Sequence, residues 1–391
     1  HEVASLSPAS GVGSTRRRRG RERGDLVNGQ RLGTIVGLEL TQRTRSVAWY
    51  VLLGVFALLL VIVTALSFLA WGAAYQPGGA IYSTIVYITL LLVVLVSPTL
   101  SGNAINGDRD AATLAPVQIT LATTAEILIG KFLAAWITGL AFVAVSVPFL
   151  AVATLAGGGE PATIAVSLLV LMFEVGIIAA IGVALSGILS RPLFSVASTY
   201  LVVAALVIGT LIAFALVGYS IRSEATSSYR SFEYGEYSGD TFPCMPGEES
   251  SDEYPCDEDA EVRCGEWQTS TYEVPRFDRV WWLLAANPFV ILADATPTQF
   301  DEYGNPNDLF GQIKFGVRAA QQPPDLEQRW DDCAPDLQND RPTPEEVIDQ
   351  SAPIWFVGMA LQLLLAAGLM WWAWARTRTP AGRLPSGTRI A

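Results

Sequence analysis

Charged side chains are scarce in this chain. Only 16% of its 391 residues are charged, against about 25% in a typical soluble domain. It contains one histidine, His1, and its lysines are Lys131 and Lys314. Between Ser46 and Gly107 there is no charged side chain at all. No soluble fold buries so long an apolar stretch, so the composition excludes an ordinary soluble enzyme and predicts a polytopic membrane protein.

Sequence motifs for catalysis and for nucleotide binding are also missing. Gly130-Lys131 resembles the end of the phosphate-binding motif G-x-x-x-x-G-K-[ST], but Ala125 replaces the first glycine and Phe132 follows the lysine. There is no G-x-S-x-G and no H-E-x-x-H motif. We therefore expect no catalytic residue, no metal and no cofactor in this chain. Energy for transport would have to come from a gradient or from another chain.

Cysteine is rare and confined to one region. The four cysteines all lie within residues 221–352; they are Cys244, Cys256, Cys264 and Cys333. An even number on the oxidising side of a membrane predicts two disulfides, with three possible pairings. Four free thiols are the alternative. Zinc binding is disfavoured because the spacings are not paired C-x-x-C motifs.

Six apolar segments reach the roughly 20 residues that a membrane-spanning helix needs. They are 46–71, 80–98, 131–155, 163–189, 195–219 and 353–375. Helix-breaking turns such as Gln76-Pro77-Gly78-Gly79 separate consecutive segments. The sequence thus predicts an all-α polytopic membrane protein with six transmembrane helices and a disulfide-containing extracytoplasmic insertion. A cleavable signal peptide is the alternative for the first segment, which is too long for a signal core.

Basic residues predict the orientation of the spans. Sixteen Arg and Lys residues lie in the tails and in alternate connecting loops, while the loops near 72–79 and 157–162 have none. This asymmetry predicts a multi-pass protein of the plasma membrane with both termini cytoplasmic. Residues 221–352 would then face outward; they hold 28 acidic and nine basic residues, a net charge of −19, whereas the rest of the chain carries +7.

These features divide the chain into five parts. We expect a disordered basic cytoplasmic tail over 1–30, a cytoplasmic amphipathic helix and five spans over 31–219, an acidic extracytoplasmic domain over 220–352, the sixth span over 353–375, and a cytoplasmic tail over 376–391. Within the acidic part, the apolar segment 280–293 is too short to span and contains Pro288. We expect it at the outer membrane surface or packed under the outward domain, with a re-entrant segment as the alternative.

The connector 105–133 alternates charged and apolar residues. Its charged start, the capping residues Thr123-Thr124 and Glu126 predict short helices along the inner membrane surface. A solvated loop is the alternative.

This connector resembles the loop after span two in permease subunits of type 2 ATP-binding-cassette exporters. The family pattern is approximately G-E-x-E-x-G-T-L-x-x-L-L-x-x-P-[LV]-[ST]-x-x-E-[IL]-x-x-G-K. The matching residues are Gly107, Asp108, Asp110, Thr113, Leu114, Glu126, Ile127, Gly130 and Lys131. The chain departs from the pattern with Asp in place of both first Glu residues, Ala112 in place of Gly and Ala122 in place of Pro. Residues 37–45 resemble the amphipathic helix that precedes span one in that family, and Asn287-Pro288 resembles an N-P element before its last span.

The resemblance implies a permease that is not itself an enzyme. It would pair with a second permease copy or a homologous permease, and with separate ATPase subunits that bind ATP and Mg. Contacts with membrane lipids are expected and contacts with nucleic acid are not. The implied ATPase-coupling residues are Glu39, Asp108, Arg109, Asp110, Thr113, Leu114, Val117, Leu121, Glu126, Gly130 and Lys131. The substrate stays open among drug, lipid, peptide and envelope precursor.

Glu174 is the one acid well inside a predicted span. A charge at such depth costs about 2.5–3.5 kcal/mol on insertion scales. Glu174 is therefore a candidate for contact with substrate or a proton in the translocation path. A protonated structural acid, hydrogen-bonded to a neighbouring helix, is the alternative.

Two other functions remain open. One is a receptor or scaffold that presents a disulfide-bonded external binding domain, but it does not explain the 105–133 motif. The other is a gradient-driven carrier centred on Glu174, but such carriers usually contain internal repeats, which this chain lacks.

Overall fold

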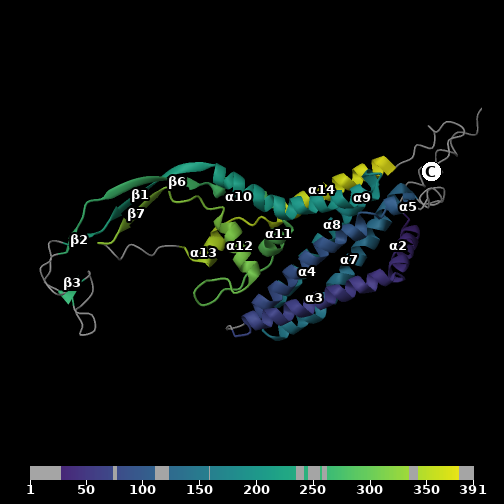
Figure 1. Cartoon of the computed structure of the whole chain (residues 1–391), viewed down its shortest axis with the longest axis horizontal. Helices are drawn as coiled ribbons and strands as arrows, with labels where there is room; N and C mark the ends of the chain where they lie inside the picture. The colour runs from purple at the N-terminus through teal and green to yellow at the C-terminus, as the bar shows by residue number, and fades with distance from the viewer. Residues whose placement is uncertain are drawn as a thin grey trace, which may run out of the picture. The chain divides into compact units, whose positions relative to one another are not determined.

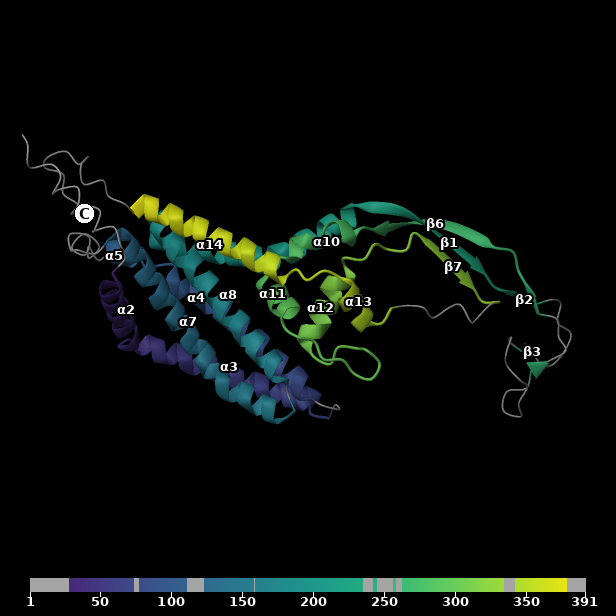
Figure 2. The same ribbon diagram turned by 180° about the vertical axis from the view of Figure 1, so that it is seen from behind.

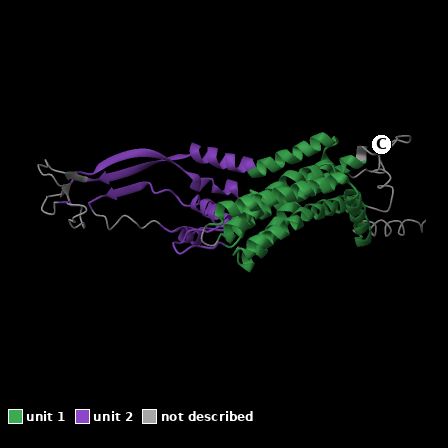
Figure 3. Ribbon diagram, turned by 60° about the horizontal axis from the view of Figure 1, so that its bottom comes forward, with its two compact units in different colours: residues 1–207, 286–297, 355–391 green, residues 208–285, 298–354 purple. Residues whose placement is uncertain are grey.

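The computed structural model describes residues 28–73, 77–110, 123–157, 159–234, 242–244, 256–257, 262–333 and 342–377. It divides into two compact units (Figure 3). Unit 1 comprises His1–Val207, Ala286–Pro297 and Trp355–Ala391, and unit 2 comprises Ile208–Ala285 and Thr298–Ile354. Most of the region between the fifth and sixth spans thus falls in unit 2, together with residues 208–219 of the predicted fifth span, whereas residues 286–297 belong to unit 1.

The chain is mostly helical, and six helices of the described part are long and apolar enough to cross a membrane. They are α3 (Val47–Trp71), α4 (Gly78–Ser101), α7 (Thr124–Leu155), α8 (Pro161–Ile188), the continuous helix α9–η1–α10 (Pro192–Ala204, Ala205–Gly209, Thr210–Ser220), and α14 (Trp355–Thr377). Within the continuous helix, η1 is a π-helical turn. The prediction of six long apolar helices is confirmed.

Helix α8 lies at the centre of unit 1 and packs against α4, α7, α9 and α14 (Figure 1). Small residues permit this close packing. At Gly182, a Cβ atom would lie 1.9 Å from the Ser101 Oγ of α4. The hydroxyl of Ser186 also accepts hydrogen bonds from the backbone N–H groups of Ile105 and Asn106, at 2.9 and 3.1 Å. The chain that leaves α4 is therefore held against α8.

Helices α3 and α9–η1–α10 are much less buried than α8. Their exposed apolar residues include Leu69 at 83% and Leu201 at 70%. Apolar surface of this kind suits contact with lipid or with another membrane helix.

Two shorter helices lie at one end of the bundle, where α4 ends and α7 begins (Figure 2). Helix α2 (Gly29–Thr44) begins at its cap Asn28, whose side chain accepts a hydrogen bond from the Gln30 N–H. Helix α5 (Asn106–Asp110) follows α4. The helix predicted at 37–45 is therefore confirmed as part of a longer helix, and a short helix is found at the charged start of the connector.

The end of the connector differs from the prediction. Thr123 and Glu126 form a capping box, but the helix that they cap is α7 itself, which continues to Leu155. The reason is that the apolar sequence after Glu126 continues without a helix-breaking turn, so the cap and the span join in one helix. The described part therefore has no separate helix at 124–130.

Unit 2 corrects the all-α prediction, which holds for unit 1 alone. It contains a three-stranded sheet in the order β6–β1–β7, with β1 (Arg222–Arg230) antiparallel to β6 (Gln268–Pro275) and parallel to β7 (Glu327–Asp331). Strands β1 and β6 are rich in Ser, Thr and Tyr, and β-branched and aromatic residues favour strands over helices. Because these strands are short and polar, the hydropathy of the sequence does not indicate them.

The remaining elements of unit 2 are short. They are β2 (Phe232–Tyr234) paired with β5 (Val262–Cys264), β3 (Phe242–Pro243) paired with β4 (Cys256–Asp257), the 3-10 turns η2 (Phe277–Arg279) and η3 (Trp281–Leu284), and the helices α12 (Leu309–Ala319) and α13 (Pro344–Gln350).

The apolar segment 280–293 does not form one continuous element. It divides into η3 in unit 2 and the start of α11 (Pro288–Ala295) in unit 1. Pro288 begins α11 rather than interrupting a helix, because proline is favoured in the first turn and Asn287 caps it by accepting from the Phe289 N–H. Six of the eight α11 residues are buried, and α11 packs against α8 and α14.

Candidate functional site

Lys131 is the centre of a charge cluster at the end of the bundle where α2 and α5 lie. Its side chain is only 3% exposed. The ammonium pairs with the carboxylate of Glu39 on α2 and, at 2.8 Å, with the carboxylate of Asp108 on α5. A buried ammonium is tolerated when carboxylates compensate it. We call these residues the Lys131 cluster; it joins α2, α5 and α7.

Glu126 makes a second connection between α2 and α7. Its carboxylate is fully buried and accepts hydrogen bonds from the backbone N–H groups of Asn28 and Thr123, both at 2.7 Å. The guanidinium of Arg31 lies 3.9 Å away. The start of α2 is therefore attached to the start of α7 by a charge-assisted hydrogen bond.

Between these two connections the helices pack closely at Gly130. A Cβ atom there would lie 2.7 Å from Cγ2 of Ile35 on α2. At the far end of α2, the guanidinium of Arg43 donates a hydrogen bond to the Leu100 carbonyl of α4 at 3.0 Å. Burial lowers the pKa of Arg43, while the nearby charge of Glu39 opposes that shift. Polar contacts thus attach helix α2 to α7 at two points, through Glu126 and Lys131, and to α4 at a third point, through Arg43.

Five of the predicted coupling residues are brought together here: Glu39, Asp108, Glu126, Gly130 and Lys131. Arg109 and Asp110 lie on α5. Thr113, Leu114, Val117 and Leu121 lie outside the described residues. Glu39 and Asp108 each pair with Lys131, so the cluster connects α2, α5 and α7 with one another.

Sequence reasoning missed Asn28, Ile35 and Arg43. Only the amphipathic character of α2 could have indicated them, because one of its faces packs on α7 and the other is exposed.

Glu174 lies in the interior of unit 1, on α8, and is fully buried. The Gln362 side chain of α14 lies beside its carboxyl group. Within the described residues, neither Glu174 oxygen makes a hydrogen bond of ordinary geometry. The Gln362 amide instead donates to the Ala286 carbonyl, just before α11, at 3.1 Å.

Helix α11 brings further polar contacts to the same unit. Asn287 donates to the Val207 carbonyl at 2.8 Å, and the Asp294 carboxylate accepts from the Trp355 N–H at the start of α14 at 3.0 Å. Sequence reasoning predicted neither these contacts nor that of Gln362 with Ala286, since all of them depend on where α11 packs.

An apolar pocket of about 260 Å³ lies between α7, α8 and α14. Its lining includes Phe132 and Trp136 of α7, Phe173 of α8 and Met370 of α14. The Trp136 indole donates to the Met172 carbonyl at 2.9 Å, which holds α7 to α8 beside the pocket. A site of this kind suits an apolar ligand.

Unit 2 contains the two predicted disulfides, and the structure decides their pairing. Cys244 is bonded to Cys256, and Cys264 is bonded to Cys333. The second disulfide joins the end of β5 to the residues just after β7.

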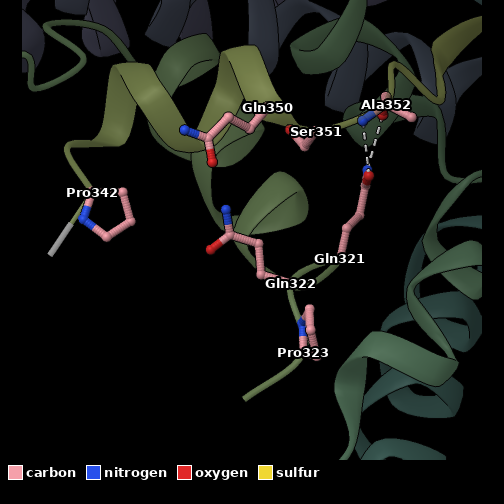
Figure 4. A pocket seen from close by; sticks show the side chains of 7 residues that line it. All are labelled: Gln321, Gln322, Pro323, Pro342, Gln350, Ser351 and Ala352. Atoms are coloured by element: carbon pink, nitrogen blue, oxygen red, sulfur yellow. Dashed lines mark hydrogen bonds between the residues drawn. The ribbon is translucent and has the colours of Figure 1, made fainter. Parts of the chain in front are cut away.

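A hollow near the ends of α12 and α13 is shown in Figure 4. Gln321 holds the chain before α14 there by two hydrogen bonds to the backbone of Ala352. The lining of this hollow among the described residues, mostly glutamines and prolines, includes no titratable side chain. The described residues also contain no group of three or more His, Cys, Asp or Glu side chains that could hold a metal ion.

Comparison with protein-family models finds no match, and comparison with curated proteins finds none. Function is therefore inferred from the residues and their contacts.

Proposed function

We propose that this chain is the membrane-spanning permease subunit of an ATP-driven exporter, and that the Lys131 cluster is its mechanical joint. The observation that carries the proposal is the pairing of Lys131 with both Glu39 and Asp108. These residues come from the two sequence segments that resemble the ATPase-coupling parts of type 2 ATP-binding-cassette permeases. The ATPase, with its ATP and Mg, would be a separate subunit.

The joint suggests how force could pass from a partner to the spans. A partner that moves α5 or α2 must also move α7, because Lys131 and Glu126 connect all three elements. Helix α7 is in turn attached to α8 through Trp136 and the Met172 carbonyl. Motion at the end of the bundle would then reach the apolar pocket and the region of Glu174. The apolar lining of the pocket favours a substrate with an apolar part.

The proposed orientation places both termini in the cytoplasm and unit 2 outside the plasma membrane. The positive-inside asymmetry of the loops supports it. The two disulfides of unit 2 support it as well, because disulfides persist in oxidising compartments. The exposed apolar surface of α3 and of α9–η1–α10 leaves room for a second permease in the membrane.

A receptor or scaffold function is the competing proposal, and unit 2 would account for it. That function gives no role to the Lys131 cluster. The decisive experiment is purification of the full chain in mild detergent, followed by identification of bound ATPase subunits and measurement of their ATP hydrolysis. An exporter permease should retain an ATPase, and a receptor should not.

Variants make this experiment specific to the joint. Lys131→Gln should reduce ATPase retention or make hydrolysis insensitive to the permease. Arg191→Gln, which removes one exposed positive charge from the connector between α8 and α9, is the matched control and should behave as wild type. Wild-type coupling in Lys131→Gln would contradict the proposal.

A further inference from the structure

A hollow of about 490 Å³ lies on one face of the β6–β1–β7 sheet in unit 2. Its lining consists of Thr226, Ser228, Trp267, Glu327, Gln328 and Arg329. Side chains alternate between the faces along a strand, and paired residues of neighbouring strands share a face. Because Thr226 pairs with Glu327 and Ser228 pairs with Arg329, these four side chains share one face. The hollow therefore combines two hydroxyl groups with one carboxylate and one guanidinium.

Trp267, just before β6, holds the guanidinium of Arg329 in place. The Arg329 Cζ atom lies over the Trp267 ring, 4.2 Å from its centroid. A cation–π contact of this kind is attractive. In the described part of the chain, the Arg329 side chain makes no ion pair and donates no hydrogen bond. Its N–H groups are therefore available to an acceptor in the hollow.

Most other charges on this face of the sheet are paired. Arg230, whose Cζ atom lies 4.8 Å from the centre of the Trp267 ring, donates two hydrogen bonds to the Asp331 carboxylate. Those bonds lower the pKa of Asp331, and the charge of Arg329 adds to the shift. Farther along the same face, Arg222 pairs with the carboxylate of Glu273 at 3.1 Å.

Glu327 supplies the charge opposite to that of Arg329. The two residues are two positions apart on β7, which separates them by about 7 Å along the strand. Among the described residues, Glu327 forms no ion pair, with Arg329 or with any other cation. Glu224 is exposed on the same face, two residues before Thr226, the partner of Glu327 in the register. One end of the hollow is therefore negative and the other is positive.

A ligand that carries both charges matches this arrangement. Glu327 and Glu224 repel a simple anion, and Arg329 repels a simple cation. A free amino acid has its ammonium and carboxylate on one carbon atom, too close together to reach both ends of the hollow. In a short peptide with free termini the two charges are farther apart. The peptide group between them can also hydrogen-bond the hydroxyl groups of Thr226 and Ser228.

We propose that this hollow binds a short zwitterionic peptide, with its carboxylate on Arg329 and its ammonium on Glu327. The hydroxyl groups of Thr226 and Ser228 hydrogen-bond the peptide group, and Trp267 positions Arg329. This binding site is independent of the proposed export function, because it needs neither the spans nor an ATPase.

The test measures binding by calorimetry to the full-length, disulfide-intact chain in nanodiscs. The probes are dialanine, N-acetyl-dialanine, which lacks the ammonium, and dialanine amide, which lacks the carboxylate. Dialanine should bind about tenfold more tightly than either blocked peptide, because each block removes one charge-assisted contact. Alanine should also bind more weakly than dialanine. No binding of dialanine, or binding of a blocked peptide or of alanine as tight as that of dialanine, would overturn the proposal.

Variants assign each end of the peptide to one residue. Arg329→Gln should weaken dialanine binding about tenfold but should not weaken binding of dialanine amide, which has no carboxylate to lose a partner. Glu327→Gln should likewise weaken dialanine binding and should not weaken binding of N-acetyl-dialanine. Trp267→Ala should weaken dialanine binding, whereas Trp267→Phe keeps a ring for Arg329 and should retain most of it.

Arg222→Gln is the matched control, since Arg222 is an exposed arginine on the same face of the sheet that does not line the hollow. It should bind dialanine as wild type does. Retention of both disulfides in each variant establishes that unit 2 is folded. Wild-type binding of dialanine when Arg329→Gln and Glu327→Gln are combined would place the peptide elsewhere and contradict the proposal.

Discussion

Lys131 on α7 pairs with Glu39 on α2, ninety-two residues earlier in the chain, and its side chain is almost wholly buried. Asp108 completes the pairing from a third element. A single lysine therefore joins three segments that the sequence keeps apart.

Removal of the Lys131 charge should destabilise the chain. Lys131→Met leaves Glu39 and Asp108 close together without a cation, and loss of one partner of a buried ion pair costs about 3–5 kcal/mol. Adding Glu39→Gln and Asp108→Asn to the same chain should restore much of that loss, because the uncompensated charges disappear. Thermal unfolding in detergent measures the cycle. Additive losses in the triple variant would mean that the three residues do not interact.

Gly130→Ala should destabilise the contact between α2 and α7. The new Cβ atom would overlap Ile35, and overpacking of this kind costs about 1–3 kcal/mol. Gly33→Ala is the matched control on α2, where no atom lies within 4 Å of the added Cβ; it should be neutral or stabilising. Ile35→Ala in the Gly130→Ala chain should recover stability. A harmless Gly130→Ala would contradict the close packing of α2 on α7.

Unit 2 should lose stability as the pH rises from 5 to 7. Burial raises the pKa of Asp308 to about 6, although the Gly311 N–H and the charge of Lys314 oppose the shift. The folded unit therefore binds this proton more tightly than the unfolded chain, whose Asp titrates near pH 4. The stabilisation is complete below that unfolded pKa and is lost as the pH rises through about 6, which amounts to about 1 kcal/mol between pH 5 and 7.

Calorimetry of the full chain at several pH values measures this effect. Asp308→Asn keeps a good helix cap for α12 and should abolish the pH dependence in this window. Asp301→Asn is the control, because hydrogen bonds from the backbone N–H groups of Asn305 and Tyr303 lower the pKa of Asp301, so its titration falls below the window. A pH dependence that persists in Asp308→Asn would exclude Asp308 as its source.

The cysteines should react only after reduction. In intact cells, a membrane-impermeant maleimide should label none of Cys244, Cys256, Cys264 and Cys333 until a reductant is added, because all four are in disulfides. Arg191→Cys supplies the control on the opposite side of the membrane and should react only after permeabilisation. Labelling of native cysteines before reduction would mean free external thiols. Labelling that needs permeabilisation would reverse the proposed orientation.

Glu174→Gln should leave assembly intact and change the pH dependence of ATP hydrolysis by the assembled complex. Glutamine keeps the shape of the side chain but cannot ionise. Glu160→Gln provides a control at the N-cap of the same helix, where the acid is exposed. An unchanged pH profile in Glu174→Gln would assign Glu174 a structural role.

Hydropathy and residue distribution determined the coarse organisation of this protein from sequence alone. The long apolar helices and the presence of two disulfides followed from local composition, because a spanning helix satisfies its backbone within one segment and cysteines pair wherever oxidation allows. The five joint residues Glu39, Asp108, Glu126, Gly130 and Lys131 were also identified, but only as a motif, without their contacts.

Tertiary structure decided what depends on contacts between distant segments. The packing of distant segments determines the partners of Lys131, the pairing of Cys264 with Cys333, and the burial of α11 against α8 and α14. It also sorted the charges of β1, β6 and β7 onto one face of the sheet, since only the strand register brings Tyr229 beside Trp330 and Tyr272 opposite Ala225. Local sequence specifies whether a segment is a helix or a strand, whereas the side chains that meet depend on how those segments pack in space.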